Sequence, residues 1–328
     1  MHAYVALNDR LLVVRDLDGN PSASERLAGL NFESVAASAE QPERVFAGTV
    51  ESGLQRSTDG GESWEQVGGF DDRVTAVTVS PHDPDVVWVG TEPSAVYHSE
   101  DGGETWTHRD GLTDLPSVDR WSFPPRPHTH HVRWLSVDPH GPETIYVAIE
   151  AGAFVRTTDA GETWEPHPDG GRLDNHTLAT HHDAPGRVYT VAGDGYAESD
   201  DGGETWSYPQ DGLEHRYVWG MAVDVEDPET VVVSAASGAR TAHTPERADA
   251  YVYRRVNGGW ERAMDGLPDP SGQVRAVLAQ GFEGGEFVAV TNRGLFVTND
   301  AAQTWERVDL DWPDEYETQV GRGLAVVE

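Results

Sequence analysis

One short sequence recurs along the chain and limits the folds open to it. The run STDGGESW at residues 57–64 is repeated with small changes at 99–106, 157–164 and 199–206, and in weaker form at 298–305. A shortened copy, NGGW, occupies 257–260. The tryptophans that end the copies stand at 64, 106, 164, 206, 260 and 305, so the steps are 42, 58, 42, 54 and 45 residues. Steps of about 40 to 50 residues are typical of β-propeller blades.

Short apolar runs around each copy predict four strands per repeat. Around the third copy they span 132–137, 144–149, 153–157 and 163–166, separated by turn-forming residues. The same layout predicts blades at about 34–69, 74–111, 132–170, 175–212, 218–266 and 274–310. Runs at 2–7, 11–16 and 24–27, together with 321–327, supply a seventh. We therefore predict an all-β, seven-bladed propeller with four-stranded antiparallel blades. It forms one domain over 1–328, closed by a blade of residues 1–30 plus 320–328.

The repeated run resembles the BNR repeat, or Asp-box, of sialidases, xyloglucanases, sortilin-type receptors and photosystem II assembly factors. Turn chemistry accounts for each residue type, because hydroxyl and carboxylate groups bond the backbone of a tight turn, glycine allows positive φ and tryptophan packs the turn onto the blade. We therefore expect a structural role for the box residues Asp59, Trp64, Asp101, Trp106, Asp159, Trp164, Asp201, Trp206, Asp300 and Trp305.

The charge composition restricts the partners. The chain has 57 acidic and 23 basic residues, a net charge of −34, and neither lysine nor cysteine. The acidic residues are spread evenly, as in proteins of halophilic archaea, where molar salt screens self-repulsion. Duplex DNA and anionic membranes are excluded as partners by like-charge repulsion. No apolar run is long enough for a membrane helix and no leader is evident, so we expect a cytoplasmic protein.

Two long insertions point to one face. In an antiparallel meander, the connections between blades and between second and third strands lie on the same face, and the Asp-boxes lie on the other. The insertions 112–131 and 235–250 both belong to the first, or top, face. Loops of this length are uncommon without a role, so we expect function there, with drift of surface loops as the alternative.

Aligned inner strands place a cationic and aromatic ring at the top of the central pore. Two residues before a shared apolar position stand Glu33, Thr75, Arg133, His176, Trp219, Arg275 and Arg322. Arginine offers a bidentate fork for carboxylate, sulfate or phosphate, and tryptophan a stacking surface. We expect Arg133, His176, Trp219, Arg275 and Arg322 to bind an anionic ligand. The alternative is that Arg322 pairs with Glu33 and the other arginines bridge blades.

Catalytic and metal-binding residues are less well defined. Resemblance to sialidases implies an arginine triad, for which Arg133, Arg275 and Arg322 are the candidates, and a tyrosine nucleophile with acidic partners, for which Tyr217, Glu150 and Asp194 are the candidates. His176 is a further catalytic candidate, as a general base. Sialidases have six blades, however, and xyloglucanases of this repeat class have two facing lobes. No organic cofactor is expected. If a divalent metal binds, we expect it in the histidine-rich loop, with His128, His130 and His131 as ligands.

Blade number favours a ligand- or protein-binding scaffold, which the seven-bladed assembly factors resemble. The alternative is a glycoside hydrolase or polysaccharide lyase that acts on an acidic glycan, in which arginine neutralises the carboxylate. The expected partners are a small anionic ligand, an acidic glycan or a protein segment.

Overall fold

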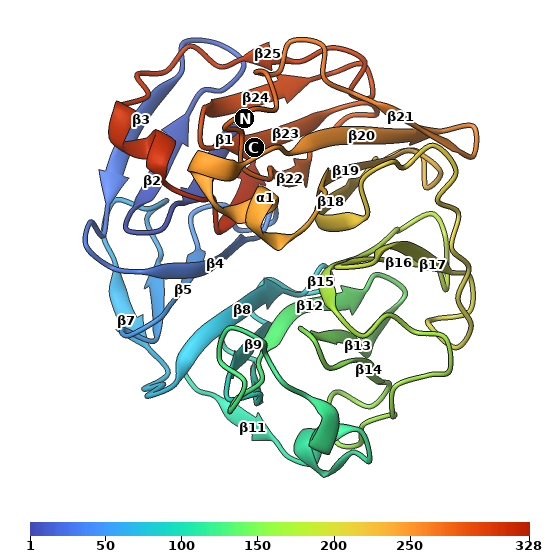
Figure 1. Cartoon of the computed structure of the whole chain (residues 1–328). Coiled ribbons are helices and arrows are strands. Elements are labelled where there is room, and N and C mark those ends of the chain that lie inside the picture. Colours follow the sequence, from blue (N-terminus) through green and yellow to red (C-terminus); the bar gives the residue numbers. More distant parts are fainter.

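Seven antiparallel sheets stand around one axis in the computed structural model, which describes residues 1–328 (Figure 1). In each sheet the strands follow one another from the axis outward, and the first strand of the next sheet returns to the axis. Sequence and structure therefore agree on an all-β propeller with seven blades. We call the end of the axis at which the inner strands begin the top face, and the opening there the pore mouth.

The blades are numbered along the chain, with the closing blade last. Blade 1 is β4 (Phe32–Ala37), β5 (Val45–Thr49), β6 (Leu54–Ser57) and β7 (Glu65–Val67); blade 2 is β8 (Arg73–Val79), β9 (Val87–Glu92), β10 (Val96–Ser99) and β11 (Thr107–Arg109); blade 3 is β12 (Val132–Asp138), β13 (Gly141–Ile149) and β14 (Ala153–Thr157); blade 4 is β15 (Asn175–Thr180), β16 (Val188–Ala192) and β17 (Gly195–Ser199). Blade 5 is β18 (Tyr217–Val223), β19 (Val231–Ala236), β20 (Tyr251–Val256) and β21 (Gly259–Arg262); blade 6 is β22 (Val277–Gln280), β23 (Phe287–Thr291), β24 (Gly294–Thr298) and β25 (Glu306–Arg307); blade 7 is β26 (Gly323–Val327), β1 (His2–Ala6), β2 (Leu11–Arg15) and β3 (Ser22–Arg26).

Helices occur only as short turns in connections. They are η1 (Leu112–Asp114), η2 (Val118–Arg120), α1 (Ala239–His243), η3 (Pro245–Arg247) and η4 (Asp314–Thr318). None has the length and apolar character needed to cross a membrane.

The two ends of the chain close the ring in blade 7. β26 pairs with β1 over five residue pairs, from His2 opposite Val327 to Ala6 opposite Gly323, and the termini lie side by side (Figure 1). Each inner strand also contacts the inner strand of the next blade, including β22 with β26 and β26 with β4. The predicted three-plus-one closure is confirmed, and it leaves no open end in the ring.

Two blades lack the fourth strand that the repeat layout predicts. In blades 3 and 4 the outer edge is reduced to single bridges, Arg156 with Glu165 and Glu198 with Ser207. Pro166 and Pro209 follow these bridges closely. Proline has no N–H to donate to a ladder, so the outer strand ends there.

The core lies between neighbouring blades as well as within them. Most second strands are buried along their whole length, as in Val45–Thr49 and Val231–Ala236, because both of their faces pack against neighbouring blades. β13 is buried only from Ile145 onward. One cluster joins Tyr4 and Val13 of blade 7 to Phe32 and Val45 of blade 1. This packing fixes each inner strand, and with it each side chain at the pore mouth.

The Asp-boxes form closed hydrogen-bonded turns. Asp59 accepts hydrogen bonds from the Ser57 hydroxyl and from the backbone and hydroxyl of Ser63, at 2.5–2.9 Å. The Ser57 hydroxyl in turn accepts from Gly61 N–H, whose φ is 87°. Hydrogen bonds from Ser63 and Ser57 lower the pKa of Asp59 to about 2. The corresponding Asp101, Asp159, Asp201 and Asp300 make the same bonds, so these carboxylates are occupied by the turn.

The box glutamates connect one blade to the next. Glu104 accepts a 2.7 Å hydrogen bond from Arg56 of the preceding blade, and Arg56 also donates to the carbonyl of Gly102. Arg156 makes the same two contacts, to Glu204 and to the carbonyl of Gly202. Arginine links of this kind thus join blades on the lower face, a structural use of the motif.

The box tryptophans differ in burial, which predicts different costs of removal. Trp305 is 3 % exposed and donates from Nε1 to the carbonyl of Ala263, whereas Trp106 is half-buried against Phe70. We expect Trp305→Ala to lower the free energy of unfolding by about 3–5 kcal/mol, and Trp106→Ala by about 2 kcal/mol. Guanidinium unfolding in molar KCl measures both. Equal costs at the two sites would contradict the assigned packing.

Candidate functional site

A β-bulge recurs at the same place in five inner strands. The pairing register skips one residue in each of β4, β8, β12, β15 and β18. The skipped residues are Glu33, Thr75, Arg133, His176 and Trp219, while Arg275 and Arg322 stand just before β22 and β26. A bulge re-aims its side chain, so five of the seven ring positions share a distinct backbone setting at the pore mouth.

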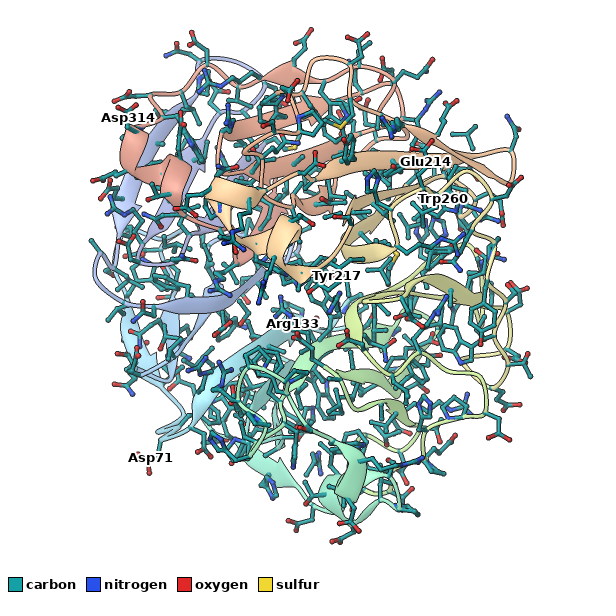
Figure 2. All side chains as sticks on the ribbon, in the orientation of Figure 1. Asp71, Arg133, Glu214, Tyr217, Trp260 and Asp314 are labelled. Atoms are coloured by element: carbon teal, nitrogen blue, oxygen red, sulfur yellow. The ribbon has the colours of Figure 1, made fainter.

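Two arginines of this ring stack on one tryptophan. The guanidinium carbon of Arg275 lies 3.1 Å from the centroid of the Trp219 ring, and that of Arg133 lies 4.4 Å from it. Arg275 is 0 % exposed, and Arg133 and Trp219 are 5 % exposed. Figure 2 places Arg133 at the centre of the ring. Trp219 thus holds the arginines in place and presents no open face of its own.

These two arginines differ from the other buried ones. Arg56 and Arg255 each donate hydrogen bonds to carboxylates, to Glu104 at 2.7 Å and Glu198 at 3.1 Å. The nearest carboxylate of Arg133 is Glu150, 3.7 Å from its Nε, and both terminal nitrogens of Arg275 have no hydrogen-bond partner. Burial lowers the pKa of Arg133, and burial together with Arg322 and Arg133 lowers that of Arg275. The mouth therefore holds guanidinium donors that no protein carboxylate satisfies.

Other ring positions serve the blades. Glu33 accepts a 2.9 Å hydrogen bond from Arg73 and lies 3.8 Å from Arg322, whose Nε donates to Asn8. Thr75 is buried and donates to the carbonyl of Val132 in the next blade. Arg322 therefore lies near Glu33, as the alternative of an Arg322–Glu33 pair predicted. The two side chains are 3.8 Å apart, and that of Arg322 is 36 % exposed.

A histidine from the second insertion completes the mouth. His243, at the end of α1, contacts the rings of Trp219 and Tyr217. Its Nδ1 accepts from Nε of Arg275 at 3.2 Å, and its Nε2 lies 3.0 Å from the Tyr217 hydroxyl. Arg275 also donates its backbone N–H to the carbonyl of Ala242 in α1. The insertion 235–250 therefore packs onto the ring, as its place on the top face suggested.

Because His243 is buried, we expect the protein to lose stability in mild acid. Burial, with the charges of Arg275 and His176, lowers the pKa of His243 from 6.5 to about 2. The unfolded chain binds a proton below pH 6.5 and the folded chain does not, so this contribution to stability is present above pH 6.5 and falls as the pH drops. The expected slope reaches about 1.4 kcal/mol per pH unit. We expect His243→Gln, which keeps an acceptor for Arg275, to remove this pH dependence of the free energy of unfolding. Denaturant unfolding between pH 7 and pH 5 measures it.

Other buried histidines with lowered pKa, such as His98 and His167, share this direction. The measurement is therefore the difference between wild type and variant. His108→Gln, at an exposed site, is the matched control and should leave the slope unchanged. Parallel curves for wild type and His243→Gln would contradict the assignment.

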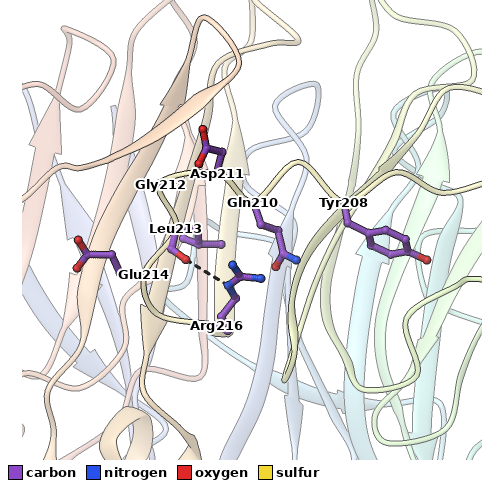
Figure 3. Close-up of a pocket in the computed structure, with 7 residues that line it drawn as sticks. All are labelled: Tyr208, Gln210, Asp211, Gly212, Leu213, Glu214 and Arg216. Atoms are coloured by element: carbon purple, nitrogen blue, oxygen red, sulfur yellow. Dashed lines mark hydrogen bonds between the residues drawn. The ribbon is translucent and has the colours of Figure 1, made fainter.

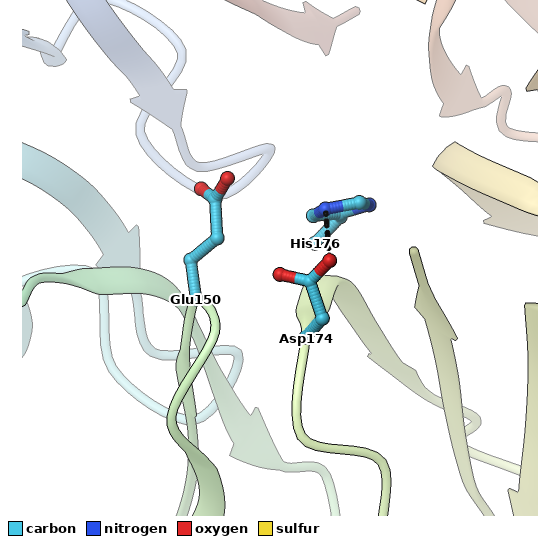
Figure 4. A group of neighbouring side chains, drawn as sticks. All are labelled: Glu150, Asp174 and His176. Carbon is cyan, nitrogen blue, oxygen red and sulfur yellow. Dashed lines mark ion pairs between the residues drawn. The ribbon is translucent and has the colours of Figure 1, made fainter. Parts of the chain in front are cut away.

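Two carboxylates and a histidine meet beside Arg133 (Figure 4). Glu150 follows β13, and Asp174 and His176 stand at the start of β15; their ligand atoms lie within 4.8 Å of one another. Burial would raise the pKa of Glu150, but the hydrogen bond from His131 and the neighbouring His176 and Arg133 lower it to about 2. Burial, then Glu150, raises the pKa of Asp174 despite His176. One carboxylate is thus held ionised and its neighbour is pushed toward protonation.

The structure brings together three of the four catalytic candidates. Glu150 and His176 share the cluster, and the Tyr217 ring centroid lies 5.1 Å from that of His176. Asp194 lies outside it, on an exposed ion pair with Arg172. Asp174 was missed, although it stands only two residues before His176, at the same end of β15.

The structure does not gather the three histidines of the loop into one group of metal-ligand side chains. His130 packs against Trp121, whereas His131 packs against Phe123 and donates to Glu150. Adjacent residues of an extended segment point to opposite sides, so these two rings diverge. The chain contains one group of three metal-ligand side chains, and neither they nor His128 belong to it. The insertion 112–131 instead packs Leu112, Leu115 and Trp121 onto blade 3, in the same core cluster as its strands.

One surface pocket lies away from the pore mouth. It measures about 450 Å³ and follows the connection between β17 and β18 (Figure 3). Its lining residues are Tyr208, Gln210, Asp211, Gly212, Leu213, Glu214 and Arg216. Arg216 donates to the carbonyl of Leu213, and no buried charged residue faces the pocket. The unsatisfied charges gather at the mouth, which is therefore the stronger candidate site.

The family comparison agrees with the turns described above. The BNR/Asp-box repeat model matches residues 55–66 and 197–208. The chain is an Asp-box β-propeller. No curated protein matches this Asp-box propeller by sequence.

Solved structures show the same fold at low identity. An ancestral GH74 enzyme is 17 % identical with a TM-score of 0.64, over 81 % of this chain and 36 % of that one. The GH74 enzyme of Niastella koreensis is 16 % identical with a TM-score of 0.64, over 93 % of this chain and 55 % of that one. YCF48 bound to D1 peptide is 16 % identical with a TM-score of 0.60, over 89 % and 91 %. The Asp-box propeller thus spans about a third to a half of the GH74 structures.

Proposed function

We propose that this Asp-box propeller is a binding protein whose pore mouth takes an anionic group, from a small carboxylated or sulfated ligand or an acidic protein segment. One observation carries the proposal: Arg133 and Arg275 are buried without a hydrogen bond to any carboxylate, although the chain has 57 acidic residues. Every other buried arginine has such a partner. An external anion would supply the missing acceptor.

The electrostatic setting favours binding in salt. Exposed ion pairs weaken in molar salt because the Debye length falls to about 3 Å. Charges in a buried, low-dielectric setting are screened much less. We propose that the protein works in the salt-rich cytoplasm of a halophile. There, salt would weaken ionic contacts at the acidic surface more than anion binding at the buried mouth. The YCF48 structure with a bound peptide supports a protein segment as one class of ligand.

Calorimetric titration of the full chain in molar KCl tests the proposal. Citrate, sulfate and an oligoglutamate peptide are the probes, with a neutral polyglycine–serine peptide of equal length as the control. Saturable binding of at least one anionic probe, and none of the neutral peptide, is expected. Absence of binding by all three anions would reject the anion-binding mouth.

A second function rests on the carboxylate pair. Glu150 and Asp174 lie close together with pKa values shifted in opposite directions, the arrangement that lets one group act as base and its neighbour as acid. Together with the GH74 neighbours, this supports hydrolysis or lysis of an acidic glycan, with Arg133 neutralising the uronate. Oligogalacturonate is the test substrate. New reducing ends alone indicate a hydrolase, and an unsaturated, ultraviolet-absorbing product indicates a lyase; Glu150→Gln should abolish either.

A further inference from the structure

His176 presents a bare nitrogen to a carboxylate. Its Nδ1 lies 2.7 Å from the carbonyl oxygen of Val218, which can only accept, so Nδ1 carries the proton. In the neutral ring, Nε2 therefore carries the lone pair. That atom is buried, has no hydrogen-bond partner and lies 3.7 Å from Oδ2 of Asp174. The lone pair of the neutral ring thus faces a carboxylate oxygen.

Such a histidine resembles a metal ligand in its supporting contacts. Histidines that bind metals usually donate their other N–H to a backbone carbonyl or carboxylate, which fixes the ring and the tautomer. The neighbouring carboxylates are supported as well: Asp174 Oδ1 accepts from the N–H of Ala151 at 3.0 Å, and Glu150 Oε2 accepts from Nε2 of His131 at 3.0 Å. Each potential ligand is thus held by a second contact and keeps a free electron pair.

From this geometry we propose that His176, Asp174 and Glu150 form a binding site for one divalent transition-metal ion. Donor atoms bound at about 2.1 Å to one ion lie roughly 3–4 Å apart, so a set within 4.8 Å closes with small rotations. The Asp174 side chain, 40 % exposed, has the freedom to make them. Two carboxylates balance the charge of the ion.

The donor set selects the class of metal. One imidazole nitrogen with two carboxylates suits zinc, cobalt, manganese or iron(II), whereas magnesium and calcium prefer oxygen ligands alone. Three protein ligands leave at least one position open, as in metal sites that bind a substrate or water. Arg133 is 3.7 Å from Glu150, so an ion here would stand beside the anion-binding mouth. The inference does not rest on that function, because the metal is measured without an anion.

The test is metal titration of the full chain, dialysed against a chelator and returned to molar KCl. Calorimetry with Zn²⁺ and the visible absorption of bound Co²⁺ are the two readouts. We expect one saturable site, Co²⁺ bands that indicate nitrogen ligation, and a higher melting temperature with metal. Asp174→Asn and His176→Gln should each weaken binding at least about tenfold.

His108→Gln is the matched control. His108 lies 2.8 Å from Asp110 in an exposed pair, so it represents the nonspecific histidine–carboxylate sites of an acidic surface. Its affinity for metal should equal that of wild type. If His176→Gln fails to fold, Asp174→Asn carries the test, because its side chain is partly exposed and the new amide can donate to His176.

Three results would overturn the proposal. The first is weak, non-saturating binding that matches the acidic surface as a whole. The second is tight binding that both variants at the cluster retain. The third is that wild type binds neither metal and Asp174→Asn melts at a higher temperature than wild type. That would mean that a hydrogen bond from the new amide is all that Nε2 of His176 requires.

Discussion

A chain that ends at Val320 is expected to lose cooperative unfolding in molar KCl. Residues 321–328 contain β26, the inner strand of blade 7, which makes five residue pairs with β1 and contacts the inner strands on both sides. Without it β1 exposes an unpaired strand edge, and the inner strands β22 and β4 lose a packing neighbour, so the ring opens. The whole fold is worth only about 5–15 kcal/mol, so losing an inner strand exceeds its margin. Tryptophan fluorescence and circular dichroism during guanidinium unfolding measure the effect.

Two controls separate closure from a general effect of shortening. Removal of Glu328 alone leaves β26 whole and should leave the unfolding midpoint unchanged. Adding a peptide of residues 321–328 to the truncated chain should restore a cooperative transition, because it refills the missing strand. A truncated chain that unfolds like the intact one would show that the closure contributes little.

The blade number and the closure could be predicted because they depend on repeats. Each Asp-box brings its own turn chemistry, so one copy predicts the local structure of every other. The unpaired runs at the two ends then had only each other as partners. The fourth strands predicted for blades 3 and 4 are absent because Pro166 and Pro209 each lack the backbone N–H that a strand ladder needs. A pattern of apolar residues does not take such single N–H groups into account.

The ring positions were found by alignment because a bulge repeats at the same place in the inner strands. What their side chains do depends on neighbours that follow no repeat. His243 comes from an insertion without a counterpart in other blades, and it covers Trp219. Trp219 was expected to stack on a ligand; in the structure both arginines contact its ring. Loop positions and cross-blade contacts are set by tertiary packing, which strand periodicity does not encode.

Replacing both Arg133 and Arg275 with methionine is expected to abolish anion binding without unfolding the protein. Methionine keeps an apolar stem against Trp219 and removes two buried charges that make no hydrogen bond to a carboxylate. Glu150, 3.7 Å from Arg133, keeps its hydrogen bond from His131. Loss of a desolvated, hydrogen-bonded charge from a complex costs about 2–5 kcal/mol, or at least thirtyfold in affinity. Removing two buried like charges should leave the free energy of unfolding unchanged or raise it. Calorimetry with the best anionic probe measures affinity, and guanidinium unfolding measures stability.

Arg56→Met is the matched control, because Arg56 is equally buried but pairs with Glu65 and Glu104 on the lower face. Arg56→Met removes the hydrogen bond to the carbonyl of Gly102 and two ion pairs with carboxylates that are 60 % and 66 % exposed. It should therefore lower the free energy of unfolding by about 1–2 kcal/mol. Its affinity for the anion should stay at the wild-type value. The two variants therefore predict opposite outcomes: binding lost with stability kept at the mouth, and stability lost with binding kept at the Asp-box. If both lower stability and neither alters binding, Arg133 and Arg275 are structural, and the ligand binds elsewhere on the propeller.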